Sequence, residues 1–287
     1  MATKKPEKLS ARNADRYALY LASVQDPGHE VKILSRVYRD AFGQDARVLR
    51  EDFCGTAAVC GEWVRQGKDR VAYGVDLDPE PLAWGRAHHL LELSPSQLER
   101  VHLLREDVRS AAEVKADVVA AQNFSFFIFR TRAQLRDYFA HAYANLADRG
   151  AFLLDMMGGP LCYQPGRIER RRLHGFTYVW EQEFFDPISH ETAFHISFEF
   201  RDGTRMKHAF SYPWRMWTMK EVTEVLEEVG FSSTVVYWHE DYTSEGSPIY
   251  RRKTKGVGDP VWLTYVVGIK GRAAARARRP AAPSRPA

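Results

Sequence analysis

Apolar and polar positions along the first 156 residues switch between helical spacing and short apolar runs. Two helices are expected first, over residues 14–24 and 29–42, and Val31, Leu34 and Val37 lie on one face of the second. The apolar runs are short enough for buried parallel strands and occupy residues 47–49, 71–75, 101–104, 118–121 and 151–156. Because helical patterns separate these runs, this part of the chain is predicted to form a doubly wound α/β sheet.

After residue 156 the pattern changes to alternation, which is typical of antiparallel strands. Three segments show it, at residues 176–185, 191–200 and 206–212. In the middle segment Phe194 and Ile196 share one face and His195 lies on the other, and Asp202-Gly203 supplies hairpin-turn chemistry. We therefore expect an antiparallel β subdomain inserted after the fifth strand, at about residues 160–217.

A helix and two strands are expected after the insert. Thr218 and Glu221 form a capping box that begins the helix, and Gly230 stands where a left-handed C-cap ends it. The two strands are expected at residues 234–238 and 262–269 as a hairpin-like pair. Together with the five earlier strands they predict a seven-stranded sheet.

Composition limits the class of protein. The chain has 287 residues, of which 45% are hydrophobic and 27% charged, so it is long and apolar enough to bury one large core. No stretch reaches the roughly 18 apolar residues of a membrane span, and the N-terminus lacks the apolar centre of a signal peptide. A cytoplasmic location is therefore expected. The three cysteines have neither disulfide nor zinc-ligand spacing, so no metal site is expected.

Positive charge is concentrated at the C-terminus. Six basic residues and no acidic one lie in residues 270–287, so the net charge of +4 falls to −2 for residues 1–269. This Ala/Pro/Arg-rich tail is predicted to be disordered, and no aromatic residue accompanies its arginines. A nucleic-acid partner and a membrane partner are accordingly not expected. The sequence leaves the oligomeric state open, with a homodimer as one option.

Side chains suited to binding a nucleotide-like ligand follow the first three predicted strands. The turn after the first strand contains Cys54, Gly55 and Thr56 and leads into a helix, an arrangement that lets a ligand approach the backbone. Asp76 closes the second strand about 20 residues after Gly55, the spacing expected of an acid that binds ribose hydroxyls. Asp107 follows the third strand, where a carboxylate can accept a hydrogen bond from an adenine amino group.

The order and wording of these segments resemble the core of class I S-adenosylmethionine-dependent methyltransferases, over about residues 45–270. The stretch LREDFCGTA resembles the first motif of that superfamily, although Phe53 and Ala57 stand where glycines are usual. The resemblance implies a Rossmann-like sheet, S-adenosylmethionine as cofactor, and a set of cofactor-binding residues: Glu51, Cys54, Gly55, Thr56, Asp76, Leu77, Asp107, Val108 and Asn123.

The resemblance also predicts how the chain is divided. Residues 1–44 are expected to form N-terminal helices that cover the cofactor site, and residues 45–159 to form the cofactor-binding core. Residues 160–217 would form a lid over the acceptor, residues 218–269 the C-terminal part of the core, and residues 270–287 the tail.

The predicted activity is methyl transfer to nitrogen or oxygen of a small-molecule acceptor. Asn123 begins an Asn-x-x-aromatic pattern like the amino-methyltransferase signature, but both of its prolines are absent. Aromatic residues where the insert and the N-terminal helix meet the core are candidate acceptor-binding residues: Phe124, Tyr163, Trp214, Trp217 and Tyr20. No catalytic residue is assigned, because methyl transfer to a neutral amine needs no base.

Three other functions remain open from the sequence. A nicotinamide dehydrogenase would share the fold but normally carries G-x-G-x-x-G, whereas residues 55–61 are GTAAVCG. An RNA or protein methyltransferase would dock its substrate on the insert. A non-catalytic protein that binds S-adenosylmethionine is the third.

Overall fold

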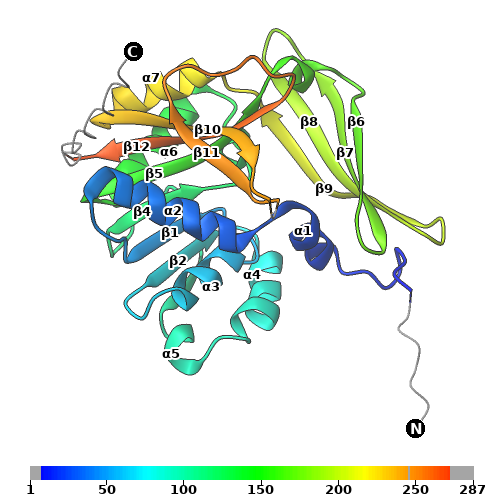
Figure 1. Cartoon of the computed structure of the whole chain (residues 1–287), viewed down its shortest axis with the longest axis horizontal. Coiled ribbons are helices and arrows are strands. Elements are labelled where there is room, and N and C mark those ends of the chain that lie inside the picture. Colours follow the sequence, from blue (N-terminus) through cyan, green and yellow to red (C-terminus); the bar gives the residue numbers. More distant parts are fainter. Residues whose placement is uncertain (1–7, 245, 272–287) are drawn as a thin grey trace, which may run out of the picture.

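The structure is a computed structural model and describes residues 8–244 and 246–271. Two β-sheets form its framework (Figure 1). The larger sheet has eight strands in the order β11-β10-β12-β5-β4-β1-β2-β3. Its strands are β1 Val48–Asp52, β2 Val71–Asp76, β3 Val101–Arg105, β4 Ala116–Ala121, β5 Leu146–Gly158, β10 Ser233–Tyr242, β11 Pro248–Lys253 and β12 Trp262–Lys270. Strands β1 to β5 are parallel, and β12, β10 and β11 join antiparallel at the β5 side. The doubly wound α/β architecture predicted from the sequence is confirmed.

The predicted number of strands was wrong by one, because β11 adds an eighth strand at the edge of the large sheet. Its sequence, PIYRRK, ends in exposed basic residues and pairs only with β10. An edge strand needs no buried face along its whole length, and charged side chains there hinder pairing with other molecules. Such a segment lacks the apolar run that identified the other strands.

Helices cover both faces of the large sheet (Figure 1). They are α1 Arg16–Val24, α2 Pro27–Phe42, α3 Ala58–Arg65, α4 Pro79–Gly85, α5 Pro95–Leu98, α6 Arg132–Asn145 and α7 Met219–Val229, with short helices η1 Arg86–Leu90, η2 Ser125–Ile128 and η3 Pro160–Tyr163. Helices α2 and α3 pack on one face, and α6 and α7 on the other. The capping box of α7 and its left-handed C-cap at Gly230 are both present, as predicted.

The second sheet is the predicted antiparallel insert, and it stands apart from the large sheet (Figure 1). It contains β6 Ile168–Arg172, β7 Phe176–Phe185, β8 Glu191–Phe200 and β9 Arg205–Arg215, in that order. Phe194 and Ile196 of β8 point toward the large sheet's side and line a cavity. The sequence did not predict β6, because all five of its residues are exposed and three of them are arginines.

Helix α1 connects the second sheet to the core. The ring of Tyr20 packs 4.9 Å from that of Phe210 on β9, measured between centroids. On its other side Tyr17 lies 5.6 Å from Trp84 of α4, whose indole nitrogen donates to the Asp15 carboxylate. The N-terminal helix therefore fixes the second sheet relative to the strands of the core.

Two further expectations from the sequence concern the C-terminal tail and membrane-spanning helices. The basic tail predicted for residues 270–287 lies outside the described residues from 272 onward. Among residues 8–244 and 246–271, no helix is long and apolar enough to cross a membrane.

Candidate functional site

The predicted cofactor residues lie where the direction of the sheet changes. From β1 the chain adds β2 and β3 on one side, and from β4 it adds β5 on the other, while β1 and β4 are neighbours. In open α/β sheets, ligands bind beyond the carboxyl ends of the strands at such a switch point. The turn after β1 and the turn after β4 both begin there.

The turn after β1 contains three left-handed residues. Phe53, Gly55 and Ala57 have φ of 59°, 52° and 57°. Phe53 and Ala57 thus adopt the conformation that glycine takes easily, at a cost of about 1–3 kcal/mol each. The turn is held by the amide of Gly55, which donates to Asp76 Oδ2 at 2.8 Å, and by that of Cys54, which donates to the Val75 carbonyl at 3.0 Å.

Gly85 allows α4 to pack directly against this turn. A Cβ atom at Gly85 would overlap the backbone carbonyl of Thr56, which cannot swing away as a side chain would. Nothing lies within 4 Å of the position a Cβ would take at Gly55. The turn is therefore tightly supported by α4 and open beside Gly55.

Asp76 and Leu77 end β2 with a half-buried carboxylate and an exposed apolar side chain. Asp76 Oδ2 accepts from Gly55 and Oδ1 accepts from the amide of Asp78 at 2.9 Å, which leaves a lone pair on each oxygen. Burial raises the pKa of Asp76. Leu77 is 62% exposed although it is apolar. This pairing fits a nucleoside, with the carboxylate toward the ribose and leucine toward the base.

Glu51 and Cys54 lie deeper in the same region. Glu51 is 4% exposed, and its Oε2 accepts from the amide of Cys60 at 3.1 Å and from the Cys60 thiol at 2.9 Å. Burial raises the pKa of Glu51 to about 7. Cys54 is buried against Gly74. The structure thus places Glu51 beneath the turn, fastened to α3.

Asp107 and Val108 after β3 are engaged with protein groups. The guanidinium of Arg109 donates to both carboxylate oxygens of Asp107, at 2.9 and 2.7 Å, and these bonds lower the pKa of Asp107 to about 2. Val108 is 5% exposed, and its carbonyl accepts from Arg50 at 3.0 Å. An adenine amino group would have to share the Asp107 carboxylate with Arg109.

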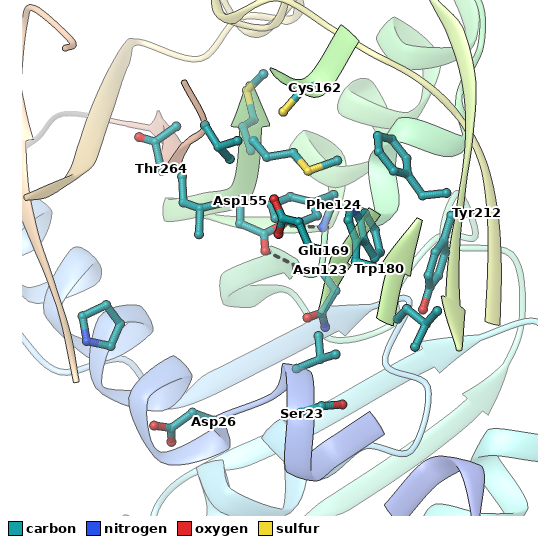
Figure 2. Close-up of a pocket in the computed structure, with 18 of the residues that line it drawn as sticks. Ser23, Asp26, Asn123, Phe124, Asp155, Cys162, Glu169, Trp180, Tyr212 and Thr264 are labelled. Atoms are coloured by element: carbon teal, nitrogen blue, oxygen red, sulfur yellow. Dashed lines mark hydrogen bonds between the residues drawn. The ribbon is translucent and has the colours of Figure 1, made fainter. Parts of the chain in front are cut away.

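The turn after β4 is held by a carboxylate that the sequence did not identify. Asn123 and Phe124 both have φ of 57°, and their amides donate to the two oxygens of Asp155 on β5, each at 2.8 Å. Figure 2 shows Asp155 beside these two residues. The only signal in the sequence is a single acid inside the apolar run AFLLDMM.

A cavity of about 400 Å³ lies between the second sheet and the carboxyl ends of β4 and β5. Helices α1 and α2 and strands β11 and β12 complete its wall. Aromatic side chains dominate its sides: Tyr20, Phe124, Trp180, Phe194, Tyr212 and Trp214. Figure 2 shows Trp180 and Tyr212 on the second sheet, facing the Asn123–Phe124 turn. The predicted residues Tyr20, Asn123, Phe124 and Trp214 all lie on this wall.

The structure does not bring Tyr163 and Trp217 to the cavity. Trp217 is 1% exposed, and its indole nitrogen donates to the Phe129 carbonyl at 3.0 Å, so it is a core residue. The ring of Tyr163 packs 4.9 Å from that of Phe185. Trp217 therefore belongs to the core, and Tyr163 packs against the end of β7.

Four acidic residues line the cavity: Asp26, Glu30, Asp155 and Glu169. Asp26 caps α2 and Glu169 forms an ion pair with Arg167, whereas Glu30 Oε2 accepts from the Tyr265 hydroxyl at 3.1 Å and from the amide nitrogen of Gln122. Burial raises the pKa of Asp155 to about 7. Burial, and then repulsion by Asp155, raise the pKa of Glu30 to about 8. Perturbed acids in a cavity are typical of functional sites.

No family model and no curated protein matches the chain. Several solved structures match its fold. An S-adenosylmethionine-dependent methyltransferase from Clostridium acetobutylicum ATCC 824 has a TM-score of 0.61 at 16% identity, over 89% of this chain and 97% of that one. S-adenosylmethionine-bound CalS10, an amino pentose methyltransferase from Micromonospora echinaspora, has 0.63 at 19%, over 91% and 99%. The sugar N-methyltransferase KedS8 from Streptoalloteichus sp ATCC 53650 has 0.59 at 17%, over 95% and 98%.

The chain has the S-adenosylmethionine-dependent methyltransferase fold. The matches cover most of this chain and nearly the whole of each neighbour. In this fold, Asn123 is one of the predicted cofactor residues, Phe124 is one of the predicted acceptor residues, and both line the aromatic cavity.

Proposed function

We propose that the chain is an S-adenosylmethionine-dependent methyltransferase whose acceptor is a small molecule enclosed beneath the second sheet. One observation carries the proposal. The Asn123–Phe124 turn, at the switch point of a methyltransferase fold, forms part of the wall of a cavity of about 400 Å³. This volume falls within the range of small-molecule pockets.

The cofactor would be held by the turns after β1 and β2. Gly55 offers backbone beside open space, Asp76 keeps one lone pair free on each carboxylate oxygen, and Leu77 presents an exposed apolar surface. When bound, S-adenosylmethionine supplies an electrophilic methyl group on a sulfonium. The residues present fit its nucleoside part in charge and in shape.

Residues of the cavity would contribute alignment and exclusion of water. Asp155 fixes the Asn123–Phe124 turn through two backbone amides, so the acceptor meets a rigid wall. Rigid alignment of two reactants can supply several kcal/mol of the barrier reduction. The rings of Trp180 and Trp214 exclude water and favour positive charge near their faces.

A small acceptor is favoured over a macromolecule. The second sheet, α1 and β11 form walls of the cavity, and its volume of about 400 Å³ suits a small molecule better than a segment of RNA or protein. The net charge of −2 over residues 1–269 also differs from the overall positive charge that is typical of nucleic-acid-binding domains. The structural neighbours CalS10 and KedS8 bear the names of sugar methyltransferases, which supports the same class.

The proposal is tested by measuring S-adenosylhomocysteine formation with a panel of small amines and alcohols, RNA, and protein. We expect methylation of at least one small molecule and of neither macromolecule. Methylation of RNA or protein alone would contradict the enclosed-acceptor function. Binding of S-adenosylmethionine without turnover on any acceptor would favour a non-catalytic binding protein.

A further inference from the structure

The carboxyl groups of Glu30 and Asp155 lack a compensating cation. Both line the cavity, and desolvation raises the pKa of each. A carboxylate that is removed from water costs free energy unless a positive charge or hydrogen bonds compensate it. Repulsion between the two contributes to the raised pKa of Glu30. In the part of the chain that the structure describes, neither forms an ion pair with a lysine, arginine or histidine.

Two arginines on the cavity wall already have other partners. Arg167 forms an ion pair with Glu169, its neighbour on β6. Arg171 donates to the Ser23 carbonyl, and its guanidinium lies 5.3 Å from the centre of the Tyr178 ring. Both arginines of the wall are therefore engaged by groups other than Glu30 and Asp155.

Hydrogen-bond acceptors are in excess around Glu30. Its Oε2 accepts from Tyr265 and Gln122, but its Oε1 accepts from none of residues 8–244 and 246–271. Gln122 is 5% exposed, and the oxygen of the same amide that donates to Glu30 is buried without a partner. A buried acceptor without a donor is unfavourable, so these groups suit a ligand rich in N–H bonds.

The aromatic wall of the same cavity suits an organic cation. The rings of Trp180 and Phe194 stack at 4.8 Å, and those of Tyr212 and Trp214 at 4.7 Å, measured between centroids. All four residues line the cavity. Aromatic faces attract ammonium groups and accommodate an apolar body.

We propose that the acceptor is an amine with an apolar body, bound as its ammonium form between Glu30, Asp155 and the aromatic wall. This inference rests on the proposed function and names its acceptor class. Glu30 Oε1 takes one proton: an N–H bond breaks, an O–H bond forms on the carboxylate, and the electron pair stays on nitrogen, where methyl transfer needs it. Asp155, whose oxygens are clamped by two amides, stays ionised and holds the remaining N–H groups.

The unmodified protein supplies the first test, without any cofactor. Benzylamine and benzyl alcohol have nearly the same shape, but only benzylamine carries positive charge at pH 8. Calorimetric titration of each should show at least a tenfold preference for benzylamine. Equal affinity for the two compounds would overturn the proposal.

Glu30→Gln supplies the second test, with Glu224→Gln as its matched control. Glutamine keeps the shape of Glu30 and an oxygen for Tyr265, and the control removes the same charge from the exposed surface of α7, outside the cavity. We expect Glu30→Gln to weaken benzylamine binding at least tenfold and benzyl alcohol binding less than twofold. Glu224→Gln should change benzylamine binding less than twofold. Equal losses in the two variants would refute the assignment.

S-adenosylhomocysteine distinguishes the two proposals, because it also carries an ammonium group. Titrated separately, it should bind the Glu30→Gln variant within twofold of the unmodified protein. If the variant loses S-adenosylhomocysteine affinity as much as benzylamine affinity, the acid pair serves the cofactor and the acceptor assignment is wrong. If the unmodified protein binds benzylamine but not S-adenosylhomocysteine, the proposed function fails and the amine site stands.

Discussion

Replacing Glu30 by glutamine is expected to stabilise the protein in the absence of ligand. Burial and the charge of Asp155 raise the pKa of Glu30 from its ordinary value to about 8 in the folded chain. Between pH 4.5 and 8 the folded state therefore binds a proton that the unfolded state has lost. Stability falls as pH rises through this window, and glutamine removes the effect.

The magnitude follows from the pKa difference. Each pKa unit corresponds to about 1.4 kcal/mol, so Glu30 alone could lower the free energy of unfolding by about 3 kcal/mol between pH 5 and pH 8. Water can enter the cavity that Glu30 faces and reduces this value. We expect Glu30→Gln to gain about 1–2 kcal/mol at pH 8 relative to pH 5, or roughly 3–6 °C in melting temperature.

Thermal unfolding of the ligand-free protein at pH 5 and pH 8 measures the effect. The comparison is made between the unmodified protein and Glu30→Gln, so that other titrating groups cancel. Glu224→Gln serves as control and should show the same difference from the unmodified protein at both pH values, because Glu224 lies on the exposed surface of α7. If Glu30→Gln destabilises the protein equally at both pH values, Glu30 is an ordinary structural residue and the reasoning is refuted.

Three further predictions concern the cofactor turn and the cavity. Asp76→Asn should weaken S-adenosylhomocysteine binding by about 1.5–3 kcal/mol in calorimetry, since a charge-assisted bond is lost; unchanged affinity would remove Asp76 from the site. Gly85→Ala should weaken that binding more than tenfold because α4 must move off Thr56, whereas Gly61→Ala, with 3.6 Å of clearance, should change it less than twofold. Trp214→Ala should lower benzylamine affinity far more than S-adenosylhomocysteine affinity in the folded variant, and equal losses would contradict its place in the acceptor pocket.

Elements with a buried face were predictable from the sequence, and strands that mainly expose charged side chains were not. The apolar runs located β1 to β5, and the capping box of Thr218 and Glu221 located the start of α7. Strands β6 and β11 escaped because they lie at sheet edges and expose arginines. Hydrophobic periodicity reports burial, so it does not reveal a strand that buries few of its side chains.

The candidate site divides in the same way. The position of Asp76 at the end of β2, shortly after the turn that contains Gly55, could be predicted from the order of the segments along the chain alone. Glu30 and Asp155 could not, because Glu30 meets Gln122 across 92 residues and Asp155 meets Asn123 across 32. Trp217 was chosen as an aromatic near the insert, but aromatic residues at such junctions also fill cores, and the structure buries it.

The central claim is that this chain binds S-adenosylmethionine at the ends of β1 and β2. Native mass spectrometry of the purified protein, alone and with added ligand, tests it most directly. The account predicts a mass increase matching S-adenosylmethionine or S-adenosylhomocysteine in a one-to-one complex, and no complex with NAD. A complex with NAD, or no complex with saturating S-adenosylmethionine, would contradict it.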